Sequence, residues 1–221
     1  MTAVFITSSG TGIGKTFVTL RLIAELEARG RSVRALKPVA SGFDAAQPEG
    51  SDTALLLRAQ GLDLTAEILD AVSPWRFAAP LSPDMAARAE RRSIPFAALV
   101  AHCRAASARA GVTLIEGIGG VMAPLDTEHT VLDWIEALDA PALLVVGSYL
   151  GSLSHSLTAA AALRQRSVTI AAVVVSESEE QPAPAAETAA SLARFVAPVP
   201  VCVLPRAAPV PLLPLVESHL S

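Results

Sequence analysis

Short runs of valine, isoleucine and leucine alternate with longer segments of helical periodicity, and this alternation constrains the fold more than any other feature. Several of the runs are apolar without strict alternation, which is typical of strands covered on both faces. The predicted strands are 3–7, 32–36, 113–115, 142–146, 170–175 and 199–204. The predicted helices lie near 15–29, 52–60, 95–110, 131–138, 152–165 and 184–195. Repeated βαβ units predict an α/β fold with a mainly parallel sheet flanked by helices on both faces.

Two stretches interrupt this alternation. Residues 73–83, "SPWRFAAPLSP", carry three prolines and two aromatic residues, and we expect a structured loop there. Residues 177–185, "ESEEQPAPA", are acidic and rich in proline, which favours an exposed loop over a domain linker. Because nothing else resembles a boundary, we expect residues 1–221 to form a single domain.

Composition narrows the class of protein. Hydrophobic residues make up 52% of the 221 residues and aromatic residues only 4%, so the core must consist of Ala, Val, Leu and Ile. The net charge is −4 and no run of Lys or Arg exceeds two, which argues against nucleic acid as a partner. Cys103 and Cys202 lack C-x-x-C spacing and are expected to be reduced thiols. The N-terminus does not resemble a signal peptide and the apolar stretch 140–147 is too short to span a membrane, so we expect a cytoplasmic protein.

The stretch "ITSSGTGIGKTFV", residues 6–18, places three glycines and a Lys–Thr pair between a predicted strand and a predicted helix. Backbone N–H groups in such a loop, together with the positive end of the helix dipole, favour a polyphosphate. Lys15 could reach the β and γ phosphates, and the Thr16 hydroxyl could ligate Mg²⁺. The pattern G-x-x-x-x-G-K-[ST] requires glycine at position 9, where this chain has Ser9. An ordinary strand-to-helix turn is the alternative, but the strand and helix around the stretch favour a phosphate loop.

Two acidic residues are candidates for holding a metal ion. Glu116 ends a short apolar strand in "VTLIEGIGGVMAPL", where it could ligate Mg²⁺ directly or through water. The glycines that follow would let the backbone approach a substrate. The alternative is an exposed acid at a strand end. Asp52 in "EGSDTALLL" also reads as an ordinary acid in the first turn of a helix, where the dipole favours it.

Lys37 ends the predicted strand "SVRALKP", and Pro38 prevents an ordinary continuation of the strand ladder. In an open parallel sheet, ligands lie beyond the carboxyl ends of the strands. Lys37 is therefore placed to neutralise an anion beside the phosphate loop. Without that context, a solvated lysine at a strand end is an equal alternative.

These motifs together resemble the dethiobiotin synthetase family. Its phosphate loop has one extra residue, Gly-x-x-x-x-x-Gly-Lys-Thr, and this spacing fits residues 8–16. "LKPVASG" (36–42) and "EGIGGVMAPL" (116–125) resemble two further signatures, and "FAAPLSP" (77–83) and "VVGSYLGSLSH" (145–155) resemble other family stretches. The order and separation of these stretches agree over nearly the whole chain. The resemblance implies a P-loop NTPase-like fold.

The family's reaction is what the resemblance implies for activity. CO₂ forms a carbamate on one amine of 7,8-diaminononanoate, ATP phosphorylates the carbamate, and the second amine closes the cyclic urea. The products are dethiobiotin, ADP and phosphate, in biotin biosynthesis. Each stage places negative charge near cations, and phosphoryl transfer depends mainly on positioning and electrostatic stabilisation.

The resemblance also implies roles for individual residues. Lys37 and Lys15 correspond to catalytic lysines, and Thr16, Asp52 and Glu116 to the Mg²⁺ ligands. Thr11 and Ser41 would contact the diamine or its carbamate. The segment Leu150, Gly151, Ser152, Leu153 and Ser154, at a predicted helix N-terminus, resembles the site that receives the substrate carboxylate from a neighbouring subunit, which implies a homodimer. The implied nucleotide site comprises Gly12, Ile13, Gly14, Lys15, Thr16, Phe17, Asp52, Glu116, Gly117, Ile118, Gly119, Ser176, Pro205, Arg206 and Ala207.

The chain departs from the family at the nucleotide site. Ser8 replaces the first loop glycine, and Gly12 stands where an acid is sometimes found. Ser176 occupies the strand end where several relatives carry an asparagine that recognises adenine. A hydroxyl cannot reproduce the paired donor and acceptor of an amide. We therefore expect either a relaxed base preference or recognition by backbone groups near 205–207.

Three other classes of protein share this fold or these motifs. A partitioning or site-placement ATPase usually carries a second lysine early in the phosphate loop, which is absent here. An amidotransferase-associated ligase needs a glutaminase domain, for which 221 residues leave no room. A degenerate binding module would not be expected to keep Lys15, Thr16, Lys37 and Glu116.

Overall fold

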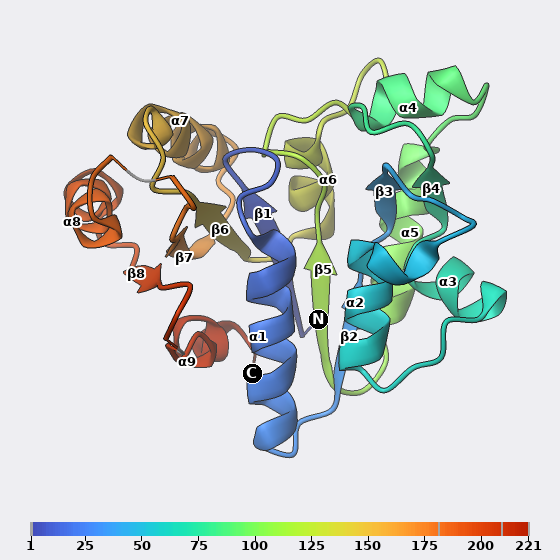
Figure 1. Ribbon diagram of the computed structural model, residues 1–221, viewed down its shortest axis with the longest axis horizontal. Coiled ribbons are helices and arrows are strands. Elements are labelled where there is room, and N and C mark those ends of the chain that lie inside the picture. The colour runs from blue at the N-terminus through green and yellow to red at the C-terminus, as the bar shows by residue number, and fades with distance from the viewer. Residues whose placement is uncertain (1, 181, 209, 221) are drawn as a thin grey trace.

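A six-stranded parallel sheet forms the centre of the molecule in the computed structural model, which describes residues 2–180, 182–208 and 210–220 (Figure 1). The strand order is β2-β5-β1-β6-β7-β8. The strands are β1 (Ala3–Ser8), β2 (Val33–Leu36), β5 (Val112–Glu116), β6 (Ala142–Val146), β7 (Ile170–Ser176) and β8 (Val201–Leu204). The predicted α/β fold with a mainly parallel sheet is confirmed, and each predicted strand lies within two residues of its observed bounds.

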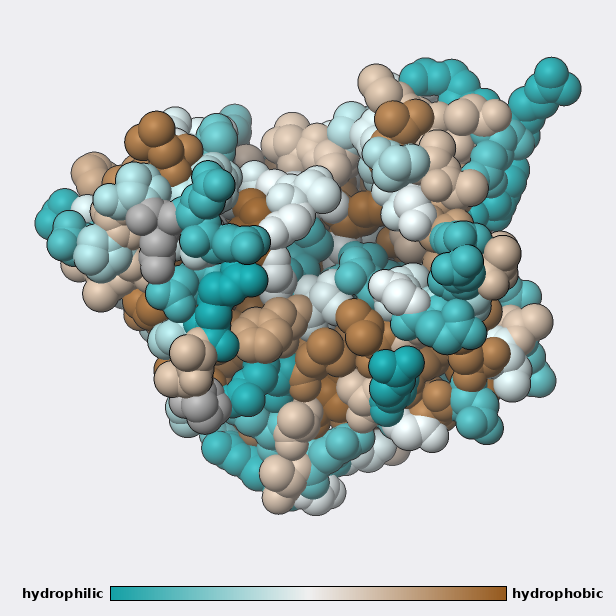
Figure 2. All heavy atoms as spheres, viewed as in Figure 1, coloured by the Kyte–Doolittle hydropathy of each residue, from teal (hydrophilic) through white to brown (hydrophobic). Residues whose placement is uncertain are grey.

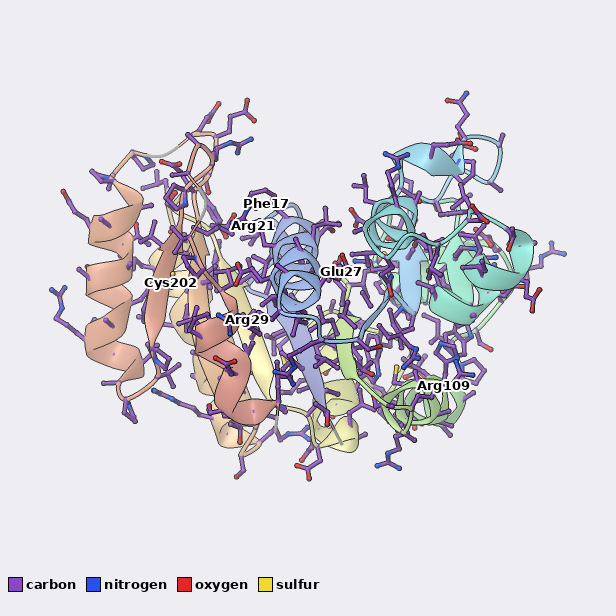
Figure 3. All side chains as sticks on the ribbon, turned by 90° about the horizontal axis from the view of Figure 1, so that it is seen from below. Phe17, Arg21, Glu27, Arg29, Arg109 and Cys202 are labelled. Atoms are coloured by element: carbon purple, nitrogen blue, oxygen red, sulfur yellow. The ribbon has the colours of Figure 1, made fainter. Side chains whose placement is uncertain are left out.

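Helices cover both faces of this sheet. One face carries α1 (Lys15–Ala28), α2 (Asp52–Ala59) and α9 (Leu213–Val216), whose buried side chains pack on Val4, Ile6 and Leu114. The other face carries α5 (Phe96–Ser107), α6 (Val131–Leu138), α7 (Ser152–Gln165) and α8 (Ala185–Val196). In Figure 3, seen from below, α1 lies in the middle of the molecule and is viewed nearly along its axis, with Phe17, Arg21, Glu27 and Arg29 labelled around it.

The core follows from the apolar composition of the strands. All residues of β1, β5 and β6 are buried, because helices cover both faces of the central strands. Trp134 and Phe5 meet edge to face, with ring centroids 4.8 Å apart, and anchor the α6 side of the core. The remaining contacts are mainly between aliphatic side chains, as the low aromatic content predicts.

A second, two-stranded parallel sheet corrects one expectation from the sequence. Residues 73–83 are not wholly a loop, because β4 (Trp75–Phe77) pairs with β3 (Val39–Ser41) and Pro83 begins α4 (Pro83–Ala89). The chain leaves the main sheet at Pro38, whose carbonyl accepts a hydrogen bond from the Trp75 N–H at 3.0 Å. Three-residue strands between prolines carry too little periodicity to be predicted.

Several shorter elements complete the described chain: η1 (Pro48–Gly50), α3 (Ala66–Val72) and η2 (Glu217–His219). In the predicted acidic loop after β7, every described residue is exposed or partly exposed except Ala185, which begins α8, and Gln181 lies outside the described residues. Both cysteines are free thiols, as expected. Within the described ranges, no helix is long and apolar enough to cross a membrane.

The outer edge of β2 is closed by a side chain. The Gln60 amide, just beyond α2, accepts a hydrogen bond from the Ala35 N–H at 2.7 Å and donates one to the Ala35 carbonyl at 3.2 Å. A third hydrogen bond, from Gln60 Nε2 to the Leu56 carbonyl at 2.9 Å, holds the amide against α2. Gln60 thus makes the two hydrogen bonds that a neighbouring strand would make.

The strand order sets the position of the candidate site. Strands β2, β5 and β1 are adjacent and parallel, so their carboxyl ends meet at one edge of the sheet. These ends carry Lys37, Glu116 and Ser8 respectively, although the three residues are far apart in sequence.

Candidate active site

The loop between β1 and α1 has the geometry of an anion-binding loop. Gly12 and Gly14 adopt positive φ angles of 72° and 97°, in the left-handed region that glycine occupies at little cost. Gly14 is the N-cap of α1 and no side chain caps this helix end. The N–H groups of the first turn are therefore offered to a ligand, where the helix dipole favours negative charge.

Lys15 lies almost entirely inside this loop, with 7% of its surface exposed. Its Nζ donates to Gly119 O at 2.9 Å, Ser8 Oγ at 3.0 Å and Gly10 O at 3.4 Å. Burial, and to a smaller extent the positive charge of Lys37, lower the pKa of Lys15 from 10.5 to about 8, against the raising influence of Glu116 and Asp52. A buried cation of this kind is stabilised by an approaching polyphosphate.

Lys37 is buried in an ion pair with Glu116. Lys37 Nζ lies 2.7 Å from Glu116 Oε1, and the two side chains are 5% and 0% exposed. Nζ also donates to the Gly117 carbonyl at 2.9 Å. The alternative of a solvated lysine at a strand end is therefore wrong, and so is that of an exposed acid at position 116.

Helix α1 orients the Glu116 carboxylate. The Thr16 hydroxyl donates to Oε1 at 2.9 Å and the Thr19 hydroxyl to Oε2 at 2.8 Å. Thr19, four residues after Lys15, was not predicted as a site residue. Its spacing of one helical turn from the phosphate loop is the only signal in the sequence that could have indicated it.

Asp52 is the first residue of α2, as predicted. Its carboxylate lies 3.6 Å from Lys37 Nζ, and its side chain is 52% exposed. Ser51 caps the helix by accepting a hydrogen bond from the Ala54 N–H. Ser51, and not Asp52, is therefore the helix cap. The Asp52 carboxylate instead faces Lys37, the lysine that is paired with the buried Glu116.

The oxygen donors at this place fit Mg²⁺. Mg²⁺ prefers hard oxygen ligands and is usually held by one or two carboxylates together with water and substrate phosphates. Thr16 Oγ1 and the carboxylates of Glu116 and Asp52 form such a set around Lys37. In the described part of the chain, no group of three or more His, Cys, Asp or Glu side chains could hold a metal.

Two cavities adjoin the loop, and Figure 2 shows the surface hollowed between the loop after β1 and the α2 side. The first, of about 460 Å³, is where the predicted phosphate and substrate residues meet: Thr11, Gly12, Ile13, Gly14, Lys15, Thr16, Lys37, Ser41, Asp52, Ile118 and Gly119 line it. Phe43, which was not predicted, also lines this cavity.

The second cavity, of about 510 Å³, lies on the other side of the loop. Gly12, Ile13, Gly14, Phe17, Ser176 and Arg206 line it together with Glu177, Ser178 and Glu179, which were not predicted. Ser176 Oγ would lie 2.7 Å from a Cβ at position 14, so Gly14 permits β7 to meet the start of α1. Ala207 lines neither cavity, and Pro205 lines a neighbouring depression.

Two of the three glycines after Glu116 have a packing role, whereas Gly119 lines the first cavity, where the expected approach of the backbone to a substrate stays a prediction. A Cβ at Gly117 would lie 2.8 Å from the Phe5 ring, and one at Gly120 would lie 3.2 Å from the Gly10 nitrogen. Gly117 lines neither cavity. The glycines at 117 and 120 thus let the loop after β5 pack on β1 and the phosphate loop.

The segment 150–154 lies apart from both cavities. Gly151 is the N-cap of α7 with a φ of 91°, which confirms the predicted helix N-terminus. Leu150 is 85% exposed and Leu153 38% exposed, whereas Ser152 is buried. No residue of this segment lines either cavity, so the segment does not complete the site within one chain.

Comparisons with known proteins agree with this geometry. A family model described as an AAA domain matches residues 2–219. The ATP-dependent dethiobiotin synthetase of Methylobacterium nodulans is 51% identical over 209 residues, covering 92% of this chain and 93% of the relative. That of Acidiphilium cryptum is 48% identical over 202 residues, covering 90% and 91%. That of Caulobacter sp. strain K31 is 49% identical over 208 residues, covering 93% and 89%.

Solved structures share the fold at much lower identity. The hydrogenase maturation factor HypB from Archaeoglobus fulgidus superposes with a TM-score of 0.54 at 13% identity, covering 93% of this chain and 81% of that one. Chloroplast FtsY from Physcomitrella patens gives 0.51 at 17% identity, covering 90% of this chain and 56% of that one. These two support the fold alone. The curated relatives go further, and by its identity to them over nine-tenths of its length, this chain belongs to the ATP-dependent dethiobiotin synthetase family.

Proposed function

We propose that this protein catalyses the ATP-dependent carboxylation and ring closure of 7,8-diaminononanoate with CO₂, giving dethiobiotin, ADP and phosphate. Family membership supports this reaction. The observation that carries it is the convergence of Lys15, Lys37 and Asp52 on one cavity at the carboxyl ends of β1, β2 and β5. The carboxylate of Glu116 is buried beside this cavity in its ion pair with Lys37. Such a site can hold a polyphosphate and a second, anionic group side by side.

The nucleotide binds at the loop between β1 and α1, which separates the two cavities. Its phosphates lie on the N–H groups at the start of α1, within reach of Lys15. The nucleoside then extends into the 510 Å³ cavity between Phe17, Ser176 and Arg206. The nucleotide thereby presents its terminal phosphate to the 460 Å³ cavity, in which the second substrate binds.

Mg²⁺ is the metal that the oxygen donors suit. When bound, it would neutralise charge on the β and γ phosphates. Thr16, Asp52 and Glu116 are the residues that would hold it. Thr19 and Lys37 keep the Glu116 carboxylate fixed at 2.8 Å and 2.7 Å, which limits the reorganisation that binding requires.

Lys37 and Lys15 are the catalytic cations of this proposal. The carbamate and the transferring phosphoryl group both carry negative charge, and fixed cations in a site shielded from water stabilise such charge strongly. Lys37 lines the substrate cavity while remaining 4% exposed, so its charge is only weakly screened by solvent. Thr11 and Ser41, on the same cavity, are placed to bind the diamine or its carbamate.

A homodimer would complete the substrate site. The α7 N-terminus at Leu150, Gly151, Ser152, Leu153 and Ser154 suits a carboxylate by its dipole, yet it does not line the chain's own cavities. Leu150 is highly exposed in the single chain, and an exposed leucine of this kind supports a contact with a second copy of the chain. We further propose that the chain acts as a single domain in the cytoplasm and binds neither nucleic acid nor membranes.

The deciding experiment offers the protein 7,8-diaminononanoate, bicarbonate, Mg²⁺ and ATP, and detects the cyclic urea by mass spectrometry. Product should require all four components and should be lost in Lys37→Ala. Arg29→Ala, which removes a surface cation, is the matched control and should keep the wild-type rate. ATP hydrolysis with no cyclic urea, accompanied by recruitment to membranes, would instead favour a partitioning ATPase.

A further inference from the structure

Ser8, where the family pattern has glycine, makes a contact that glycine cannot make. It ends β1 and is fully buried. Its Oγ accepts a hydrogen bond from Lys15 Nζ at 3.0 Å. The hydroxyl proton has two acceptors within reach, Gly10 O at 2.6 Å and Gly119 O at 2.9 Å. The side chain therefore joins the lysine to both loops that border the site.

The Lys15 ammonium is fully engaged by protein acceptors. An ammonium has three N–H donors, and Lys15 directs its donors to Ser8 Oγ, Gly119 O and Gly10 O. A phosphate can bind Lys15 only by replacing at least one of these acceptors.

The position of Ser8 indicates which contact is given up. Lys15 and Gly119 line the 460 Å³ cavity, whereas Ser8 and Gly10 do not. Ser8 thus lies behind the lysine as seen from the cavity. When Nζ moves towards a phosphate in the cavity, it moves away from the Ser8 hydroxyl.

We propose that Ser8 is a positioning residue that retains Lys15 against the loop and so weakens the binding of nucleoside di- and triphosphates. The contact is released when Lys15 turns to the phosphates. The inference rests on the proposed function only in requiring that a nucleotide binds at this loop. Its consequence is a nucleotide site tuned to lower affinity by the chain's own departure from the family pattern.

Removing the hydroxyl should therefore tighten nucleotide binding. A hydrogen bond to a charged group contributes enough that its loss from the free protein should lower the dissociation constant for ADP about tenfold. The Gly10 and Gly119 carbonyls are only partly buried, so water can take the place of the hydroxyl there. AMP lacks the β and γ phosphates that Lys15 reaches, so its affinity should not change.

The test is calorimetric titration of full-length wild type, Ser8→Ala and Ser8→Gly with ADP and with AMP. Both variants should bind ADP about tenfold more tightly and AMP as the wild type does. In steady-state kinetics KM for ATP should fall while kcat stays constant, because the gain applies equally to substrate and transition state. Thr7→Val is the matched control, since Thr7 is buried beside Ser8 and its hydroxyl has no hydrogen-bond partner.

Several results would overturn the inference. Unchanged or weaker ADP binding in the folded variants would show that Ser8 does not restrain Lys15. An equal gain for AMP and ADP would indicate a general change of loop packing. If Ser8→Ala does not fold, Ser8→Gly decides, and failure of both to fold would make the hydroxyl purely structural. A wild type that binds ADP but forms no cyclic urea would refute the proposed reaction and leave this comparison valid.

Discussion

Replacing Lys37 by methionine tests whether the buried pair with Glu116 is a structural as well as a catalytic element. The substitution keeps the length of the side chain but removes the charge that lies 2.7 Å from a fully buried carboxylate. Removal of one partner of a buried ion pair typically costs 3–5 kcal/mol, roughly, because the other charge remains without compensation. Glu116 retains hydrogen bonds from Thr16 and Thr19, so we expect the lower end of that range, about 3 kcal/mol.

The assay is thermal and urea unfolding of the protein without nucleotide or metal. For a chain of this length, a loss of about 3 kcal/mol lowers Tm by about 6–12 °C. The double variant Lys37→Met/Glu116→Gln leaves neither charge buried, so it should recover most of this loss. Arg29→Met is the matched control, because Arg29 pairs with Glu217 at 2.8 Å on the surface, where ion pairs contribute little.

Two results would refute this reasoning. If Lys37→Met unfolds at the wild-type temperature, the carboxylate does not depend on the lysine. If the effects of the two substitutions simply add, the pair is not coupled, and the loss in the single variant has another cause.

The remaining predictions concern nucleotide, proton and metal. Lys15→Ala should lower turnover by ~10²–10³ while the fold survives, and near-normal rates in a folded variant would exclude a catalytic role. The pKa of Lys15 is about 8 in the folded protein and 10.5 in the unfolded chain. Between pH 8 and pH 10.5, the unfolded chain therefore binds a proton that the folded protein has lost. The difference in the free energy of unfolding between wild type and Lys15→Met should therefore rise by about 3 kcal/mol from pH 8 to pH 10.5, in favour of wild type. A difference that does not change with pH would contradict the lowered pKa. Glu116→Gln and Asp52→Asn should weaken the binding of Mg²⁺ more than the binding of the diamine. Unchanged Mg²⁺ affinity in titrations of both variants would show that neither carboxylate binds the metal. With Ser176 at the base cavity, CTP or GTP should support kcat/KM within about tenfold of ATP, whereas Ser176→Asn should restore preference; rejection by a hundredfold or more in wild type would refute this.

The main sheet could be predicted because its strands are locally encoded. Each buried strand is a short apolar run, and the glycines and Lys–Thr pair after β1 identify the loop that follows. The small sheet could not be predicted, because β3 and β4 each have three residues and pair across more than thirty positions. Helix α3 was missed for a similar reason, since its seven residues bury little apolar surface.

The state of Lys37 could not be decided from the sequence either. Whether a lysine at a strand end is solvated or buried depends on its neighbour in space. Its partner Glu116 lies 79 positions away and is brought near by the pairing of β2 with β5. In the same way, Ser8 reads as a defect in the loop pattern until the contacts with Lys15 and Gly119 are known.

The Gln60 amide on β2 has a consequence for the behaviour of the protein in concentrated solution. An uncovered outer strand offers its peptide groups to any extended chain, which makes sheet edges starting points for aggregation. Gln60 occupies both peptide groups of Ala35, in the middle of a four-residue strand. A second molecule could add to this edge only by first displacing the amide, so a single side chain helps to keep a hydrophobic α/β sheet from growing beyond its own chain.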